Sequence, residues 1–373
     1  MVHNGPLAVE AHIQRYRPSN VTIGQTNGSM EMFRTRIVAA AILLVLILGS
    51  AMAQDRHPNI VYILADDFGQ GSLGCYGAPP SLVKTPAIDS LAKGGMRFLD
   101  ASAPSSICSP TRYAVLYGRY PWRTRMKFGV VNVADPLLPD PARPSLPAYL
   151  QSKGYKTAAI GKWHLGYGAE RKQSSKDWTN PLTPGPLDIG FDYHFGVPQN
   201  HGDMTGIYIE NDQIYGLDSD KVFPYSRSFY GSQYLGFDAP QRVNKDAMAV
   251  LTDKAVHWLE NTANQPFFLF FTPVAVHHPI TPSDAMRGES GCGPYGDFIQ
   301  DLDRSVERIL QSLDKLGVRN DTMVVFTSDN EQRRVARRQT PHMGRRRARP
   351  PYRAMARPYS TRTRNQRHDE SRR

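Results

Sequence analysis

Cysteine is scarce in this chain: three residues in 373 exclude a small fold held together by disulfides. A long hydrophobic run is also missing, since the longest one, residues 37–48, is shorter than the roughly 20 residues of a membrane-spanning helix. We therefore expect no stable membrane span. With 40% hydrophobic residues the chain can still bury a sizeable core. The spacing of Cys75 and Cys292 leaves open whether they pair or stay free.

Residues 331–373 lack Lys, Leu, Ile, Phe and Trp, so they cannot form an apolar core and we expect a disordered, Arg-rich tail. They hold fifteen arginines against three acids, a formal charge of +12, whereas the whole chain carries +11; residues 1–330 therefore sum to −1. Such a body lacks the positive charge of a nucleic-acid-binding domain, and we expect no nucleic-acid partner. We interpret the tail as a shifted reading frame; a basic interaction tail is the alternative.

The N-terminal part has the pattern of a secretory signal in residues 30–53. A short basic region is followed by the twelve apolar residues 37–48, and then by Ala51-Met52-Ala53, with small residues where a signal peptidase cleaves. We expect export, to the periplasm, a lumen or the medium, after cleavage near Ala53; an uncleaved anchor is the alternative. Residues 1–29 are polar and without periodicity, and we interpret them as a non-structural extension.

Apolar runs alternate with segments of helical spacing along residues 54–330. Strands are predicted at 59–65, 155–160, 267–272 and 322–327, and helices at 86–93, 145–153, 246–260 and 295–316. This alternation predicts an α/β fold with a largely parallel central sheet sandwiched by helices. Residues 165–240, rich in Gly, Pro, Tyr and Asp, are interpreted as long loops over one sheet edge.

Hard oxygen donors follow two of the predicted strands. Asp66 and Asp67 end the first strand, and Asp329 and Asn330 end the last. Ligands gather at the carboxyl ends of parallel strands, and this donor set suits Ca²⁺ or Mg²⁺. Either pair alone also fits loop acids or a helix cap.

Two further segments carry reactive side chains. In Cys108-Ser109-Pro110-Thr111-Arg112 a lone Cys lies near a planar cation suited to an oxyanion, although a lone Cys is often a buried hydrophobe or a free thiol. Lys162 and His164 follow a strand and can face one side of its loop, where they would stabilise charge and carry protons; two unrelated surface cations are the alternative. His277 is a further candidate.

Four motifs resemble the sulfatase family in the family's order. Residues 106–118, with Cys108-Ser109-Pro110-Thr111-Arg112, resemble its C-x-P-x-R signature, and residues 154–164, ending in Gly161-Lys162-Trp163-His164, resemble its second signature. Residues 59–67 are similar to its first metal segment, and 327–330 to its last. The resemblance extends from residue 58 to residue 330 and is nearest to arylsulfatases, a branch that includes enzymes acting on sulfated sugars.

The resemblance implies an alkaline-phosphatase/sulfatase-like catalytic domain in residues 54–330 that hydrolyses aryl or carbohydrate sulfates. Cys108 would be oxidised by a formylglycine-generating enzyme to Cα-formylglycine, whose hydrate attacks sulfur and leaves a sulfated enzyme. Ca²⁺, rather than Mg²⁺, would be held by Asp66, Asp67, residue 108, Asp329 and Asn330.

The resemblance also implies roles for four further side chains. Arg112 would orient the ionised diol, and Lys162 would bind both diol and sulfate. His164 would take the diol proton when sulfate is released, and His277 would contact sulfate and help to protonate the departing alcohol.

The chain departs from the family pattern after Asn330. Glu331 stands where the family usually has Gly, and neither the family's Gly-rich stretch with a second sulfate-binding Lys nor its C-terminal subdomain is visible. We therefore expect exposed apolar surface, poor solubility and weak or no activity. Two alternatives stay open: a phosphonate or phosphodiester hydrolase of the same superfamily, and a non-catalytic secreted protein that binds polyanions through its Arg tail.

Overall fold

The computed structural model describes residues 36, 57–223, 236–330 and 355–356. The chain divides between Arg56 and His57, and the fold reported below is that of the unit beginning at His57. The predicted extension 1–29, signal segment 30–53 and tail 331–373 lie outside the described residues, apart from Arg36 and Met355–Ala356. No helix in the described ranges combines the length and apolarity needed to cross a membrane.

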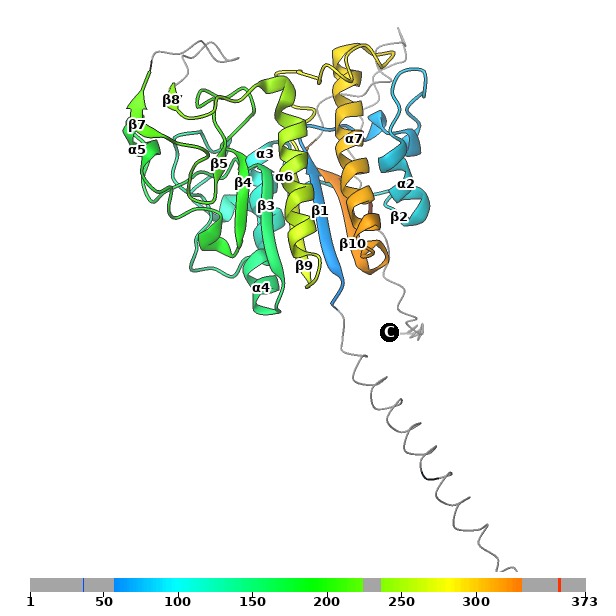
Figure 1. Cartoon of the computed structure of the whole chain (residues 1–373), viewed down its shortest axis with the longest axis horizontal. Coiled ribbons are helices and arrows are strands. Elements are labelled where there is room, and N and C mark those ends of the chain that lie inside the picture. Colours follow the sequence, from blue (N-terminus) through cyan, green and yellow to red (C-terminus); the bar gives the residue numbers. More distant parts are fainter. Residues whose placement is uncertain (1–35, 37–56, 224–235, 331–354, 357–373) are drawn as a thin grey trace, which may run out of the picture. The chain divides into compact units, whose positions relative to one another are not determined.

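A nine-stranded sheet in the order β2-β11-β10-β1-β9-β3-β4-β5-β6 forms the centre of this unit (Figure 1). Its strands are β1 (Asn59–Ala65), β2 (Met96–Arg97), β3 (Lys156–Lys162), β4 (Tyr193–Val197), β5 (Ile209–Glu210), β6 (Gln213–Ile214), β9 (Phe267–Thr272), β10 (Thr322–Ser328) and β11 (Met355–Ala356). The strands from β10 to β4 pair in parallel, and antiparallel strands extend both edges. A small second sheet pairs β7 (Ser219–Val222) with β8 (Phe237–Asp238).

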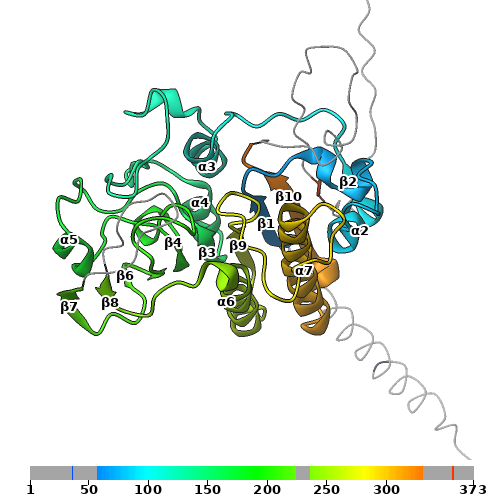
Figure 2. The same ribbon diagram turned by 90° about the horizontal axis from the view of Figure 1, so that it is seen from above.

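Helices cover both faces of the sheet, as Figure 2 shows from above. The helices are α2 (Pro86–Gly94), α3 (Cys108–Tyr117), α4 (Leu146–Ser152), α5 (Lys176–Thr179), α6 (Ala247–Thr262) and α7 (Pro294–Lys315), with 3₁₀ turns η1 (Gln70–Ser72), η2 (Gly74–Tyr76), η3 (Pro121–Arg123), η4 (Leu187–Ile189), η5 (Asn244–Asp246) and η6 (Arg319–Asp321). Helices α2, α6 and α7 share one apolar cluster with the sheet, and α3 and α4 share another.

The sequence of β9 explains why the sheet is covered on both sides. Side chains alternate across a strand, and in β9 every residue is buried. Phe267, Leu269 and Phe271 belong to the cluster of α6 and α7, while Phe268 and Phe270 belong to the cluster of α3 and α4. A continuous apolar run is what a parallel strand covered on both faces requires.

The predicted α/β fold with a largely parallel sheet is confirmed. The predicted strands 59–65 and 267–272 have the observed bounds, and the four predicted helices lie within a few residues of α2, α4, α6 and α7. The interpretation of 165–240 as loops is wrong at β4, a buried strand paired with β3. β4 has five residues, and its YHFGV sequence includes a Gly, so the apolar run that marks the other parallel strands is missing.

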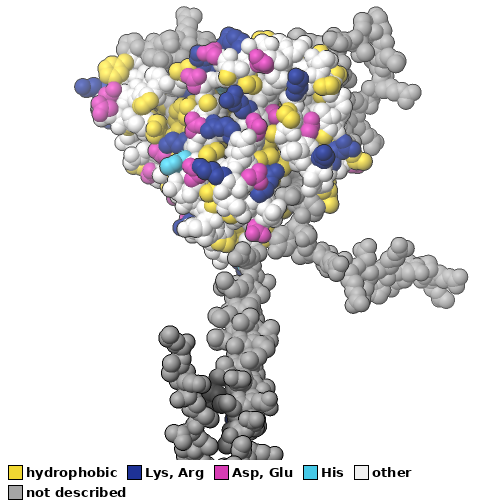
Figure 3. Space-filling view, turned by 45° about the vertical axis from the view of Figure 1, so that its right-hand side comes forward, with side chains coloured by type: hydrophobic (Ala, Val, Ile, Leu, Met, Phe, Trp, Pro, Cys, Tyr) yellow, Lys and Arg dark blue, Asp and Glu magenta, His cyan; other side chains and the backbone are white. Residues whose placement is uncertain are grey.

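The surface of this unit has no single sign of charge on the face drawn in Figure 3. Lys and Arg side chains lie between Asp and Glu side chains across that face. This mixture agrees with the charge of −1 carried by residues 1–330.

Gly161, in β3, lies in close contact with the backbone of β9, and a substitution at this position tests how tightly the two strands pack. Its φ of +126° is unfavourable for other residues, and a Cβ atom there would lie 2.0 Å from the backbone oxygen of Thr272. We predict that Gly161→Ala lowers the free energy of unfolding by about 3 kcal/mol or more, measured by urea denaturation. Gly94→Ala is the matched control, because no atom lies within 4 Å of its added Cβ. Equal stability of the two variants would contradict the observed packing.

Candidate active site

The carboxyl ends of β1 and β10 bring two acidic segments together. The strands pair in parallel with Ala65 opposite Ser328, so Asp66 and Asp329 both lie one residue beyond the paired ends. The backbone N–H of Asp329 donates to the carbonyl oxygen of Ala65 at 3.0 Å, and the N–H of Asp67 donates to Asp329 Oδ1 at 3.0 Å. Residues 262 positions apart in the sequence are thereby held in one buried cluster.

Two fully buried cations hold these carboxylates. Arg112, from α3, donates through one terminal nitrogen to Asp329 Oδ2 at 2.8 Å and to Asp66 Oδ1 at 3.2 Å. Lys162, the last residue of β3, donates to the two oxygens of Asp66 at 2.7 and 2.9 Å. Burial lowers the pKa of both cations, but the carboxylates outweigh it and the pKa of each is raised, so both stay charged.

Arg112 also joins α3 to the sheet. Its second terminal nitrogen donates to the carbonyl oxygen of Lys162 at 2.8 Å, and the hydroxyl of Thr272 donates to the same oxygen at 2.8 Å. This contact fixes the start of α3 against the ends of β3 and β9, and with it the position of Cys108.

Cys108 is the first residue of α3 and is only 6% exposed. Its Sγ lies 3.4 Å from Lys162 Nζ and 3.8 Å from Asp67 Oδ1. Burial, assisted by the neighbouring carboxylates, raises the pKa of this thiol despite the nearby lysine. The thiolate is the nucleophilic form of cysteine, so the unmodified side chain is a poor nucleophile.

His164 and His277 lie at the same edge of the sheet and are uncharged at neutral pH. Burial, followed by the charges of Lys162 and Arg112, holds the pKa of His164 well below its usual value. Burial, followed by the charge of Lys162, lowers the pKa of His277 to about 3. His277 Nδ1 donates to the carbonyl of His278 at 2.6 Å, so Nε2 is the nitrogen that faces the site, 3.5 Å from Asp67 Oδ2.

The acidic residues form a set of possible metal ligands. Atoms of Asp66, Asp67, Cys108 and Asp329 all lie within 4.8 Å of one another. Asp67 Oδ2 and Asn330 Oδ1 are buried and accept no hydrogen bond from the residues that the structure describes. Burial raises the pKa of Asp67, and burial raises the pKa of Asp329 to about 6. The nearby cations therefore do not fully offset the cost of burying the two ionised carboxylates. Clustered hard oxygens with free lone pairs fit a divalent cation.

The structure brings all nine residues singled out in the sequence to this edge, and it adds a neighbouring buried network. Arg242 donates to Asp203 Oδ1 at 3.1 Å and to the carbonyl of His201 at 2.7 Å, which fixes the loop after β4. Burial, followed by the charge of Arg242, holds the pKa of His201 well below its usual value. The only sequence signal for this loop is the polar run Asn200-His201-Gly202-Asp203, which follows a strand that the sequence does not reveal.

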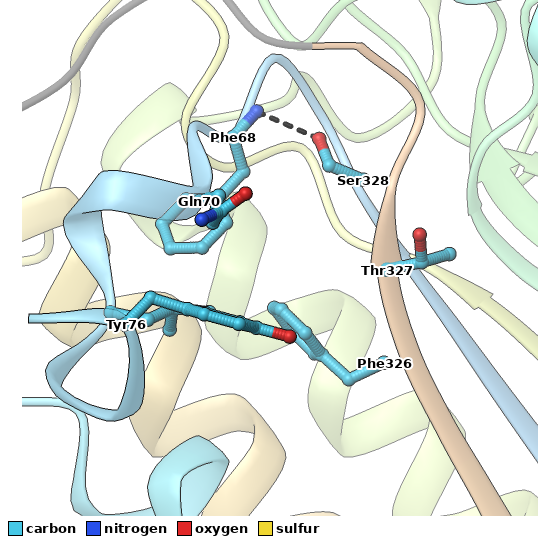
Figure 4. A pocket seen from close by; sticks show the side chains of 7 residues that line it. Phe68, Gln70, Tyr76, Phe326, Thr327 and Ser328 are labelled. Carbon is cyan, nitrogen blue, oxygen red and sulfur yellow. Dashed lines mark hydrogen bonds between the residues drawn. The ribbon is translucent and has the colours of Figure 1, made fainter. Parts of the chain in front are cut away.

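A small hollow lies beside the end of β10, and it is too small for a substrate. It is lined by Phe68, Gln70, Leu73, Tyr76 and residues 326–328, and the N–H of Phe68 donates to Ser328 Oγ across it at 2.9 Å (Figure 4). Its volume of about 10 Å³ is near the minimum for one water molecule. The buried edge cluster is therefore the better candidate for chemistry.

The parallel sheet thus carries buried acids, two buried cations and a cysteine at one edge, and comparisons with known proteins identify the family. The family model described as Sulfatase matches residues 58–353. The chain is 33% identical over 307 residues to the N-acetylgalactosamine-6-O-sulfatase of Bacteroides thetaiotaomicron, and 33% identical over 299 residues to human arylsulfatase A. The chain therefore belongs to the sulfatase family.

The same comparisons show how much of the family's architecture the chain contains. The two matches cover 74% and 77% of this chain but 59% and 54% of those relatives. A solved structure, from work on the metabolism of multiple glycosaminoglycans by Bacteroides thetaiotaomicron, superimposes with a TM-score of 0.67 and 32% identity over 74% of this chain and 63% of that one. The chain thus spans between about half and two thirds of the length of these proteins.

The buried cation at the end of β3 allows a test of the cluster. We predict that Lys162→Met, measured by urea unfolding with a chelator present, lowers the free energy of unfolding by about 3 kcal/mol, because Asp66 loses two buried hydrogen bonds. Lys315→Met, which removes an exposed ion pair to Glu260 at 3.4 Å, is the control and should leave stability nearly unchanged. A similar small effect for both variants would show that the buried pair is not formed.

Proposed function

We propose that this protein hydrolyses sulfate esters of sugars, with residue 108 as nucleophile after its conversion to Cα-formylglycine. The position of Cys108 carries the proposal: Sγ lies between Lys162 Nζ and Asp67 Oδ1, at 3.4 and 3.8 Å, at the N-terminus of α3. Membership of the sulfatase family supports the same reaction class.

Conversion of Cys108 requires a formylglycine-generating enzyme as a partner. Because Cys108 is 6% exposed at the base of the site, that enzyme has to act before the segment around α3 folds. When present, the hydrated aldehyde supplies the attacking hydroxyl that a protonated thiol does not.

Ca²⁺ is the cation that we assign to the oxygen cluster. Asp66, Asp67, Asp329 and Asn330 would hold it together with residue 108, and the unpartnered Asp67 Oδ2 and Asn330 Oδ1 fit that task. When bound, the cation withdraws charge from a sulfate oxygen. Four protein oxygens from buried carboxylates and an amide suit Ca²⁺ better than Mg²⁺, which keeps several of its waters.

The remaining side chains bind the sulfate and transfer protons. Arg112 and Lys162 place two permanent charges beside residue 108, so they stabilise an ionised hydroxyl there, and Lys162 also binds sulfate. His277 presents Nε2 to the site; it would gain a proton there when the negatively charged sulfate ester is bound and would then give that proton to the departing alcohol, while His164 takes a proton from residue 108 when sulfate is released.

Sulfated sugars are the substrate class that we favour. The relative from Bacteroides thetaiotaomicron is named for the 6-O-sulfate of N-acetylgalactosamine. A sugar alkoxide leaves less readily than a phenolate. Protonation of the leaving group by the site therefore accelerates hydrolysis of sugar sulfates more than hydrolysis of aryl sulfates. We further propose export after cleavage near Ala53, which the basic, apolar and small-residue pattern of residues 30–53 supports.

Peptide mass spectrometry across residues 106–119, combined with kinetics, tests the nucleophile. We predict that residue 108 carries an aldehyde in active material, and that Cys108→Ala lowers the turnover of 4-nitrophenyl sulfate by at least about 10³-fold. Cys292→Ala, which changes a half-buried cysteine before α7, should retain both the aldehyde and the activity. Fully converted protein without turnover, or faster hydrolysis of 4-nitrophenyl phosphonate, would contradict the proposal.

Thermal unfolding with added cations tests the metal site. We predict that Ca²⁺ stabilises the protein by about 2.7 kcal/mol at a hundredfold excess over its dissociation constant, and that Mg²⁺ stabilises it less. Asp67→Asn should abolish the calcium response, because it removes one of the buried donors. Asp314→Asn, on the exposed side of α7, is the control and should respond as the unmodified chain does. A calcium response that survives Asp67→Asn would place the ion elsewhere.

A further inference from the structure

The loop that carries His277 is held at two points, one on each side of that residue. On the N-terminal side, Asp66 donates its backbone N–H to the carbonyl oxygen of Ala275 at 3.0 Å and accepts from the N–H of Val276 at 2.7 Å. The chain just before His277 is therefore fixed to the carboxyl end of β1.

On the C-terminal side, the loop is held by His201, a residue to which the proposed mechanism gives no role. His201 is 0% exposed. Its Nε2 lies 2.8 Å from the carbonyl oxygen of Pro279 and 3.1 Å from the hydroxyl oxygen of Thr281. These two residues follow His277 by two and four positions, so His201 fixes the chain just beyond the residue that we propose as the acid.

The Nε2 atom of His201 is the donor in these contacts. The pKa of His201 lies well below its usual value because the ring is buried and Arg242 is close, so the ring is neutral and carries one proton. Nδ1 is buried and has no hydrogen-bond partner among the described residues, whereas Nε2 faces two oxygens. The proton therefore belongs on Nε2, which donates to the carbonyl of Pro279.

The position of His201 is itself fixed by its neighbours. Its carbonyl oxygen accepts from Arg242 Nε at 2.7 Å, and Arg242 forms a buried ion pair with Asp203 at 3.1 Å. The ring of His201 contacts Phe298 of α7, with the ring centroids 5.8 Å apart. A donor that is held in this way can in turn hold the loop that it contacts.

The contact with Pro279 reaches the imidazole of His277 through one residue. His277 Nδ1 donates to the carbonyl oxygen of His278 at 2.6 Å, and that carbonyl forms the peptide bond to Pro279. His201 holds the next carbonyl along the chain, that of Pro279. It thereby restrains the peptide group that orients the imidazole and directs Nε2 of His277 toward the site.

We propose that His201 is a positioning residue for His277: through Pro279 it holds the imidazole of His277 in the orientation from which the departing alcohol receives its proton. The inference rests on the proposed function, and it adds a residue that is too deeply buried to touch the substrate. Acid assistance matters more for a poor leaving group than for a good one. Loss of the His201 contact should therefore change the leaving-group dependence of hydrolysis, which a general loss of stability would not do.

Kinetics with two aryl sulfates test the inference on the calcium-loaded full chain with residue 108 converted. The substrates are 4-nitrophenyl sulfate and 4-methoxyphenyl sulfate, of which the second has the poorer leaving group. His201→Asn places an amide nitrogen near the present position of Nδ1 and removes the donor at Nε2. We predict that it lowers kcat/KM for 4-methoxyphenyl sulfate at least about tenfold more than kcat/KM for 4-nitrophenyl sulfate.

Two variants serve as controls. His201→Gln returns an N–H donor to the position of Nε2, so the ratio of the two kcat/KM values should stay within about twofold of that of the unmodified chain. His194 is also buried, but its hydrogen bonds go to Tyr167 and to the carbonyl of Ala159, and not to the His277 loop. His194→Asn should therefore lower both kcat/KM values by the same factor.

A double variant shows whether His201 acts through His277. His277→Ala alone should shift the ratio of the two kcat/KM values in the same direction as His201→Asn. Addition of His201→Asn to His277→Ala should then leave this ratio unchanged, because the acid is already absent.

An unchanged ratio with His201→Asn, or a further shift of the ratio in the double variant, would overturn the inference. If His201→Asn does not fold, Thr281→Val removes the second oxygen that faces Nε2 and should shift the ratio at least about twofold; an unchanged ratio would then overturn the inference. Absence of 4-nitrophenyl sulfate turnover by the converted, unmodified chain would overturn the proposed function and this inference together. Normal turnover with a ratio insensitive to position 201 would tell against this inference alone.

Discussion

Five charged side chains share one buried space at the edge of the sheet, and the remaining architecture serves to hold them there. Asp66, Asp67 and Asp329 lie against Arg112 and Lys162 with almost no exposure to solvent. Removing such charges from water is costly, and the attraction between them compensates only when their geometry is good and their hydrogen bonds are complete. The parallel register of β1 and β10 and the contact of α3 with β3 provide that geometry.

The cluster has an excess of negative charge and of unpaired oxygen atoms. Three carboxylates face two cations, and two buried oxygens, Asp67 Oδ2 and Asn330 Oδ1, accept no hydrogen bond from a described residue. A divalent cation bound there would relieve both deficits and would stabilise negative charge at residue 108.

Much of the central fold could be predicted because its parallel strands are unusually apolar. The run 267–272 is buried on both faces, and the spacing of apolar residues in 295–316 corresponds to the buried stripe of α7. β4 was not predicted because it is short and includes a polar residue, His194. Burial of His194 is compensated by its hydrogen bonds to Tyr167 and to the carbonyl of Ala159. Those partners are 27 and 35 residues away, so no local pattern reveals the strand.

The sequence alone determined the chemical identity of the site's components: paired acids after strands, a Cys-x-Pro-x-Arg segment and a Lys-x-His segment, because motifs and apolar runs are local properties. Tertiary structure alone decided that Arg112 bridges Asp66 and Asp329 and that Arg242 holds the loop of Asp203. Distances between side chains and their burial depend on strand order and register, which bring together residues far apart in the chain.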